Sequence, residues 1–122
     1  MNMHSKEETV FKICSREEWN LAIENGIYHG SALDLGDGFI HLSTRDQVVE
    51  TAQLHFRGLD DLVLVAIDPS GLDIRYEESR NGQMFPHLYS DLPVESALNV
   101  QSILLDENGI PLITMNMLAI DQ

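Results

Sequence analysis

The fold is decided by one stretch, Leu62-Val63-Leu64-Val65-Ala66-Ile67, which follows Asp61 and precedes Asp68-Pro69. Six consecutive apolar residues between turn residues are typical of a strand that is buried on both faces. Such a strand requires a sheet that is covered on each side by other elements. This stretch therefore predicts a buried strand in a domain built from both sheet and helix.

Shorter stretches on either side of it read as further strands. Turn signals separate them, namely Arg80-Asn81-Gly82 and Glu107-Asn108-Gly109. Pro86 lacks a backbone N–H, which places its strand at a sheet edge or at a bulge. The predicted strands, besides the buried one, are residues 10–13, 38–43, 74–77, 84–89, 98–105 and 110–114.

Two helices are predicted, at residues 16–25 and 45–56. Capping boxes precede both, formed by Ser15 with Glu18 and by Thr44 with Gln47. Between them, residues 27–37 are rich in turn formers and read as a surface loop bordering a site. The fold class is therefore α+β, with a mixed sheet of six or seven strands and two main helices.

Length and composition favour one globular domain at residues 9–115, with a loose extension at 1–8 and a tail at 116–122. The net charge of −13, from 20 acidic and 7 basic residues, argues against a nucleic-acid partner but allows a small anionic metabolite. The sequence lacks an 18-residue apolar run and a signal-peptide pattern, and it has one cysteine, Cys14. We therefore expect a cytoplasmic protein without membrane contact, as a monomer or weak homodimer.

Polar side chains gather on three predicted strands. Alternation along a strand places His41 on one face with Phe39 and Ser43, and His87 between Phe85 and Tyr89. If these faces line one cleft with Glu77, the set suffices for proton exchange, so His41, Glu77 and His87 are the candidate catalytic residues. The candidate ligand-binding residues are Lys12, Ser43, Arg75, Ser79, Arg80, Phe85 and Tyr89, and no metal site is predicted.

Each candidate also has a plainer interpretation. His41 and His87 are equally consistent with hydrogen-bonded, partly buried strand residues, and Glu77 with a solvated one. Arg80 fits an exposed turn residue, and His29 and His55 fit surface positions. Cys14 reads as a small packing residue, because no neighbouring base that could form a thiolate is identifiable.

Several blocks of the sequence resemble a bacterial family named domain of unknown function 952. The specific ones are Asp37-Gly38-Phe39-Ile40-His41-Leu42-Ser43 and Phe85-Pro86-His87-Leu88-Tyr89, in a match over about residues 9–110. That family is similar to a compact ADP-ribosyltransferase fold, which implies a split β-sheet that holds NAD between its halves. The resemblance places His41 in the central cleft, with residues 79–82 beside it. Transferases of this fold open with His-Gly-Thr, whereas this chain has Lys12-Ile13-Cys14-Ser15.

Three functions follow from these patterns. The first is an ADP-ribosyltransferase-like enzyme that acts on NAD as a substrate, on ADP-ribose or on a small phosphorylated nucleotide, with transferase or NAD-glycohydrolase-like activity. The second is a non-catalytic binding module that kept the cleft and lost the chemistry, which the missing first-strand His favours. The third is a structural partner protein, with an apolar patch contributed by residues 115–120.

Overall fold

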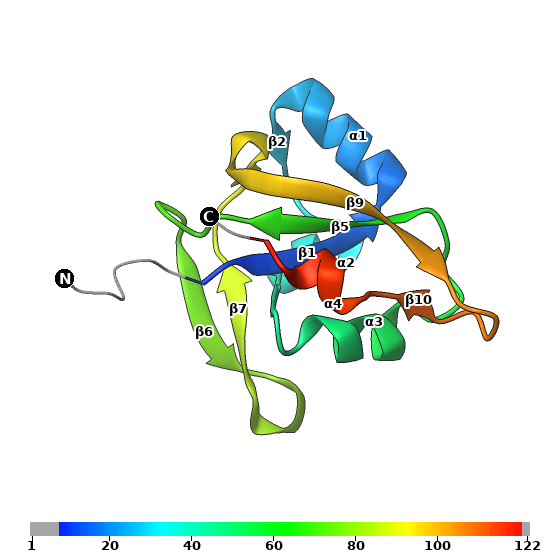
Figure 1. Cartoon of the computed structure of the whole chain (residues 1–122). Helices are drawn as coiled ribbons and strands as arrows, with labels where there is room; N and C mark the ends of the chain where they lie inside the picture. The colour runs from blue at the N-terminus through cyan, green and yellow to red at the C-terminus, as the bar shows by residue number, and fades with distance from the viewer. Residues whose placement is uncertain (1–7, 121–122) are drawn as a thin grey trace.

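The computed structural model describes residues 8–120, so residues 1–7 of the predicted extension lie outside the described residues. Within that range all strand pairs are antiparallel, in sheets of five, two and three strands (Figure 1). The strands are β1 (Val10–Ser15), β2 (Ile27–Tyr28), β3 (Ile40–His41), β4 (Ser43–Thr44), β5 (Leu62–Ile67), β6 (Ile74–Glu78), β7 (Met84–Leu88), β8 (Leu92–Pro93), β9 (Ala97–Leu105) and β10 (Pro111–Leu112). The α-helices are α1 (Arg16–Asn25), α2 (Ala32–Asp37), α3 (Val48–His55) and α4 (Met115–Leu118).

The five-stranded sheet has the order β10-β9-β5-β1-β4, and all six residues of β5 are buried. One face of β5 packs with Trp19 and Ala22 of α1, and the other packs with Val48 of α3 and Leu118 of α4. Alternate β5 side chains enter the two clusters, because successive residues of a strand point to opposite faces. The predicted strand that is buried on both faces is thus confirmed.

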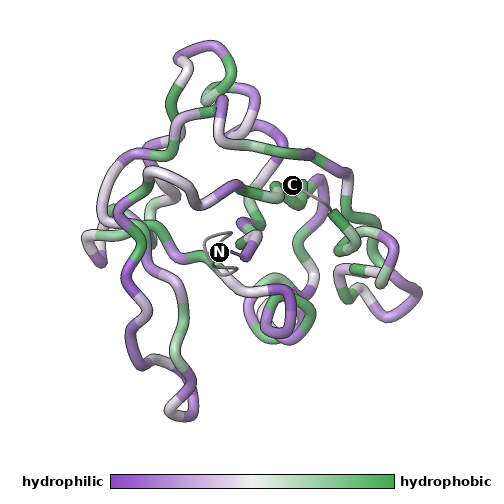
Figure 2. Tube along the Cα trace, turned by 60° about the vertical axis from the view of Figure 1, so that its left-hand side comes forward, coloured by the Kyte–Doolittle hydropathy of each residue, from purple (hydrophilic) through white to green (hydrophobic). Residues whose placement is uncertain are grey.

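The three-stranded sheet, β3-β7-β6, joins the large sheet through Leu42. Residues Ile40 and His41 pair with β7, whereas Ser43 and Thr44 pair with β1, so the predicted strand at 38–43 is divided between two sheets. The β6–β7 hairpin extends away from the rest of the domain (Figures 1 and 2), and its outer strand is the more hydrophilic. It closes at the predicted turn Arg80–Gly82, where Asn81 has φ 55°.

Two predictions about strands are wrong. The sheet is not mixed, since every described pair is antiparallel, and the count exceeds seven because short strands such as β2 and β8 add to it. The strand that contains Pro86 is the inner strand of its sheet rather than an edge. It tolerates proline because β3 ends opposite His87, and the Pro86 carbonyl accepts the N–H of Leu42 beyond that end.

The helices differ from prediction in two places. α1 has the predicted bounds and capping box, and Gly26 ends it with φ 80°. The second main helix begins at Val48 rather than at 45, because residues 44–47 form a turn closed by the bond from the Gln47 N–H to the Thr44 carbonyl; of the predicted capping box, the bond from the Thr44 N–H to the Gln47 side chain is present. Residues 27–37 are not a loop, since they contain β2 and α2.

The C-terminal segment packs on the sheet through α4. Leu118 is 4% exposed within the cluster formed by α3 and β5, whereas Met115 is 82% exposed. Cys14 is a buried free cysteine, and burial raises the pKa of its thiol to about 12, in agreement with a packing role. Among residues 8–120 we find no helix with the length and apolar character needed to cross a membrane.

Candidate functional site

Two of the predicted catalytic residues face each other across the small sheet. His41 on β3 is the register partner of His87 on β7, and their ring centroids lie 5.8 Å apart. Phe39 contacts both rings: its own ring stacks on His87 at 4.0 Å and lies tilted at 4.6 Å from His41. The structure therefore brings both imidazoles together, through the pairing of β3 with β7, which alternation within each strand could not predict.

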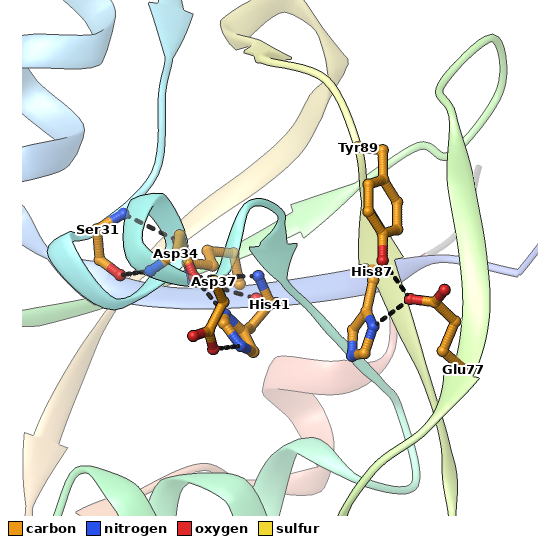
Figure 3. A network of polar contacts seen from close by, with 8 residues as sticks. Ser31, Asp34, Asp37, His41, Glu77, His87 and Tyr89 are labelled. Carbon is orange, nitrogen blue, oxygen red and sulfur yellow. Dashed lines mark hydrogen bonds and ion pairs between the residues drawn. The ribbon is translucent and has the colours of Figure 1, made fainter.

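Glu77 on β6 holds His87 in place (Figure 3). Its Oε1 accepts hydrogen bonds from His87 Nδ1 at 2.8 Å and from the Tyr89 hydroxyl at 2.6 Å. The hydrogen bond from Tyr89, followed by that from His87, holds the pKa of Glu77 below its usual value. The bond between Tyr89 and Glu77 also raises the pKa of Tyr89. An ionised carboxylate only accepts hydrogen bonds, so in the neutral His87 ring the hydrogen is on Nδ1 and Nε2 is an acceptor.

The second carboxylate of the site is Asp34, which the sequence did not single out. Its side chain is 1% exposed, and four N–H groups point at its two oxygens. Oδ2 accepts from Lys12 Nζ at 2.8 Å and from the Ser31 backbone at 2.9 Å, while Oδ1 accepts from His41 Nδ1 at 2.6 Å and from the His41 backbone at 3.1 Å. Asp34 is thereby fully hydrogen-bonded, which a buried carboxylate requires.

His41 is held on both sides of its ring (Figure 3). Nδ1 contacts Asp34, and Nε2 lies 3.0 Å from Oδ2 of Asp37, whose side chain is 46% exposed. Because ionised carboxylates only accept, the ring satisfies both contacts when both nitrogens carry hydrogen. In this arrangement His41 is held between two carboxylates, whereas His87 has the freer nitrogen.

The predicted ligand-binding residue Lys12 faces inward. It is 5% exposed, and its ammonium donates to Asp34 and to the backbone carbonyl of His41 at 3.1 Å. Two of its three donors are thus used within the protein. Lys12 neutralises Asp34 in this structure rather than presenting a free charge to a ligand.

Acid should weaken the fold through Asp34. Burial alone would raise the pKa of Asp34, but the hydrogen bond from His41 and the charge and hydrogen bond of Lys12 outweigh it, so the pKa lies well below its ordinary range. A lowered folded-state pKa contributes stability that is complete above the unfolded value of about 3.9 and is lost as the pH falls through the folded value. Urea unfolding from pH 7 to acid pH should show this loss, and Asp34→Asn should show a shallower one. Parallel curves for the two proteins would contradict it.

Asp34 sits in α2, where it forms a capping box with Ser31. The Ser31 hydroxyl accepts the Asp34 N–H at 3.1 Å, while the Asp34 side chain accepts the Ser31 N–H. This Ser-x-x-Asp spacing is the signal that could have revealed α2 from the sequence. Gly38, with φ 88°, then ends the helix and turns the chain into β3, which delivers His41 to Asp34.

A methyl group at Gly30 is expected to disturb this arrangement. Gly30 has φ +113°, and a Cβ there would lie 2.8 Å from the Cβ of Asp34. Gly30→Ala should lower the free energy of unfolding by about 1–3 kcal/mol, measured by urea denaturation. Gly36→Ala is the control, because nothing lies within 4 Å of its Cβ position and alanine favours α2. Equal stability of the two variants would contradict the close contact.

An open groove of about 470 Å³ adjoins the site. Its lining includes Phe39 and Tyr89, whose ring centroids lie 5.3 Å apart, together with Asp34, His29 and Asp91. His29 and Asp91 are joined by a contact of 3.0 Å between Nδ1 and Oδ1, and both are more than half exposed. The groove has the volume and mixed lining of a small-molecule site.

The other predicted binding residues fall into two groups. Arg75 lies over the Tyr89 ring at 4.4 Å and is paired through two nitrogens with Asp73. Arg80 lies over the Phe85 ring at 4.8 Å, beside α3. Two serines lie outside the imidazole cluster: the Ser43 hydroxyl bonds Thr51, and Ser79 is exposed at the hairpin end.

Two residues of α3, Thr51 and His55, contact Arg80 but were not predicted as site residues from the sequence. Their long separation from Arg80 in sequence left no local signal. Among residues 8–120 no group of three or more His, Cys, Asp and Glu side chains is arranged to hold a metal ion.

Comparison with known proteins places the chain among uncharacterised relatives. A family described as "Protein of unknown function (DUF952)" matches residues 13–100. The crystal structure of protein CC0527 from Caulobacter crescentus is 45% identical, with a TM-score of 0.86 over 92% of this chain and 99% of that chain. Its solution NMR structure is 46% identical, with a TM-score of 0.76 over 84% and 90%. No curated protein matches the chain.

Proposed function

This chain belongs to the Protein of unknown function (DUF952) family, and from that premise we propose that it is a small-molecule enzyme whose general base is His87. The observation that carries the proposal is that Glu77 Oε1 accepts hydrogen bonds from both His87 Nδ1 and the Tyr89 hydroxyl, beside the stacked ring of Phe39. A carboxylate that holds one imidazole nitrogen leaves the other as a base. Family membership adds no reaction, so the chemistry is inferred from the site.

The aromatic lining favours a ligand with a planar ring. Phe39 and Tyr89 both line the groove, and an aromatic ring on the ligand would stack on such surfaces. We therefore propose NAD, ADP-ribose or a small phosphorylated nucleotide as the ligand class. The resemblance to ADP-ribosyltransferases supports the same class.

The carboxylates favour a reaction that develops positive charge. The partly exposed carboxylates of Asp37 and Glu77 lie beside the two imidazoles, and carboxylates stabilise an oxocarbenium-like centre at a ribose carbon. In the proposed step, His87 Nε2 takes a proton from water or an acceptor hydroxyl as its oxygen bonds to the ribose carbon. The bond from that carbon to the leaving base breaks, and the base departs with its electron pair.

His87 Nε2 is the nitrogen that this step would use. Within residues 8–120 it has no hydrogen-bond partner, yet it is not among the wholly buried unsatisfied atoms, which are Tyr28 Oη and Arg80 Nε. The His87 side chain is 7% exposed, so little of the ring is open to solvent.

Isothermal titration with NAD, ADP-ribose and nucleoside monophosphates tests the proposal. We expect at least one of them to bind, with affinity lost in Phe39→Leu and retained in Tyr89→Phe, which keeps the ring but removes the hydroxyl. Product analysis by chromatography then tests turnover. Absence of binding for every compound of the panel at millimolar concentrations would contradict the proposed ligand class.

A second candidate function is binding without turnover. The near-complete burial of His87 and the double pairing of His41 favour it, because neither imidazole is broadly open to a substrate. Under this alternative the wild type binds a panel nucleotide but forms no product, and substitution of His87 changes affinity alone.

A further inference from the structure

We propose that Arg80 forms an anion subsite on the same sheet face, with Thr51 and His55, and that it binds the phosphate group of the ligand. This inference deepens the proposed function, on which it rests, by making a phosphorylated compound the preferred ligand. It is based on the contacts of the Arg80 guanidinium and on the absence of a hydrogen-bond partner for its Nε within residues 8–120.

The other cations of the small sheet and its surroundings are already neutralised. Lys12 is buried against Asp34 at 2.8 Å. Arg75 donates through Nε and Nη2 to both carboxylate oxygens of Asp73, at 3.3 and 3.1 Å. Such pairing uses the guanidinium edge that would otherwise grip a phosphate. Lys12 therefore offers no free charge to a ligand, and Arg75 has one of its two-donor edges occupied by Asp73.

Arg80 is held differently. Its side chain is 19% exposed over the Phe85 ring, and Nη1 lies 3.2 Å from His55 Nε2. Its contact with Thr51 Oγ1 is 3.5 Å, and the Glu50 carboxylate lies 3.9 Å away with its side chain 52% exposed. The guanidinium thus has no close carboxylate, since a charge-assisted hydrogen bond to a carboxylate normally spans about 2.7–2.9 Å.

One donor of Arg80 is unsatisfied. Nε is buried and has no hydrogen-bond partner, one of two such side-chain atoms within residues 8–120. A buried donor without a partner lowers the stability of the folded protein. Binding of an acceptor that pairs with this donor removes that cost and is therefore favoured. Small shifts of Arg80 and of the exposed Glu50 would let an anionic oxygen reach this donor and the Thr51 hydroxyl.

The subsite lies on the proposed reaction face. Phe85, His87 and Tyr89 point to the same side of β7, so successive members are about 7 Å apart. Arg80 over Phe85 thus lies at one end, His87 in the middle, and the Tyr89 ring beside the groove at the other end. A ligand with a phosphate at Arg80 and a ring near Tyr89 would place its ribose between these ends, beside Phe39 and His87.

Inorganic pyrophosphate tests the subsite without a ring. We expect it to shift the Arg80 Nε–H signal in a ¹⁵N-edited NMR spectrum, assigned by its loss in Arg80→Lys. Affinity from calorimetry should fall about tenfold or more in Arg80→Gln and in Arg80→Lys, which keeps the charge but not the two-donor edge. Arg75→Lys, on the same face and already paired, should bind as the wild type does.

The outcomes separate this inference from the proposed function. Arg80-dependent pyrophosphate binding with no response to adenosine or its phosphates would uphold the subsite and remove the ring ligand. Equal binding of adenosine and its diphosphate, unchanged in Arg80→Lys, would overturn the subsite and keep the ring site. The subsite is also overturned if pyrophosphate leaves the wild-type Arg80 signal unshifted, or if Arg75→Lys weakens pyrophosphate binding as much as Arg80→Lys does. Arg80 would then only hold the hairpin against α3.

Discussion

Replacing Asp34 with Asn is expected to lower the free energy of unfolding by about 3–5 kcal/mol, because it leaves the ammonium of Lys12 buried without a counter-charge. Lys12 is 5% exposed in the central sheet, and water cannot take over the role of the lost carboxylate. The asparagine amide also keeps only one of the two acceptor oxygens, so its NH2 group faces N–H donors on one side, either those of His41 or those of Lys12 and Ser31. Urea denaturation at pH 7, followed by circular dichroism, measures the loss.

Asp37→Asn is the matched control for this result. It removes a carboxylate from the same imidazole, but the Asp37 side chain is 46% exposed, so the expected loss is at most about 1 kcal/mol. The double variant Lys12→Met with Asp34→Asn should recover part of the stability, since no charge is then left buried. A loss below about 1 kcal/mol in Asp34→Asn alone would mean that Lys12 finds another partner or solvent.

The second large effect concerns catalysis. His87→Gln should reduce product formation by about 100- to 10,000-fold on any panel nucleotide that the wild type consumes, the range typical of losing a general base. Affinity for that nucleotide should change little, because Phe39 and Tyr89 supply the ring contacts. Single-turnover kinetics together with calorimetry distinguish these two quantities.

Two further variants define the role of His87. Glu77→Gln leaves the imidazole in place but removes the charged acceptor that fixes hydrogen on Nδ1, so turnover should fall by a smaller factor and the ring tautomer should change in ¹⁵N spectra. Asp60→Asn, at an exposed position outside the groove, should have wild-type turnover. Turnover in His87→Gln within about threefold of the wild type would remove His87 from the mechanism.

Much of the candidate site could be predicted from local pattern. Strand alternation placed His41, His87 and Tyr89 correctly on shared faces, because the period of two is a property of the extended backbone. The position of Ser43 could not be predicted in this way. The chain leaves one sheet for the other at Leu42, and Ser43 consequently contacts Thr51 rather than the imidazoles.

The role of charged groups was less predictable than their position. Lys12 and Arg80 were both predicted to bind a ligand, but Lys12 lies 2.8 Å from an aspartate 22 residues away, whereas Arg80 has its carboxylate neighbour, Glu50, at 3.9 Å. Whether a cation is free depends on which carboxylate the fold places beside it. That information lies in tertiary contacts rather than in the flanking residues.

The sequence by itself determined the elements whose causes are local. Six apolar residues at 62–67 required a strand covered on both faces, and the Ser15–Glu18 box with Gly26 set both ends of α1. Tertiary structure alone decided that Asp34, in a stretch that reads as a loop, is the most enclosed carboxylate of the site. A charged group can be buried only where distant segments, here β1 and β3, supply its partners. The residues that flank it in the sequence do not reveal those partners.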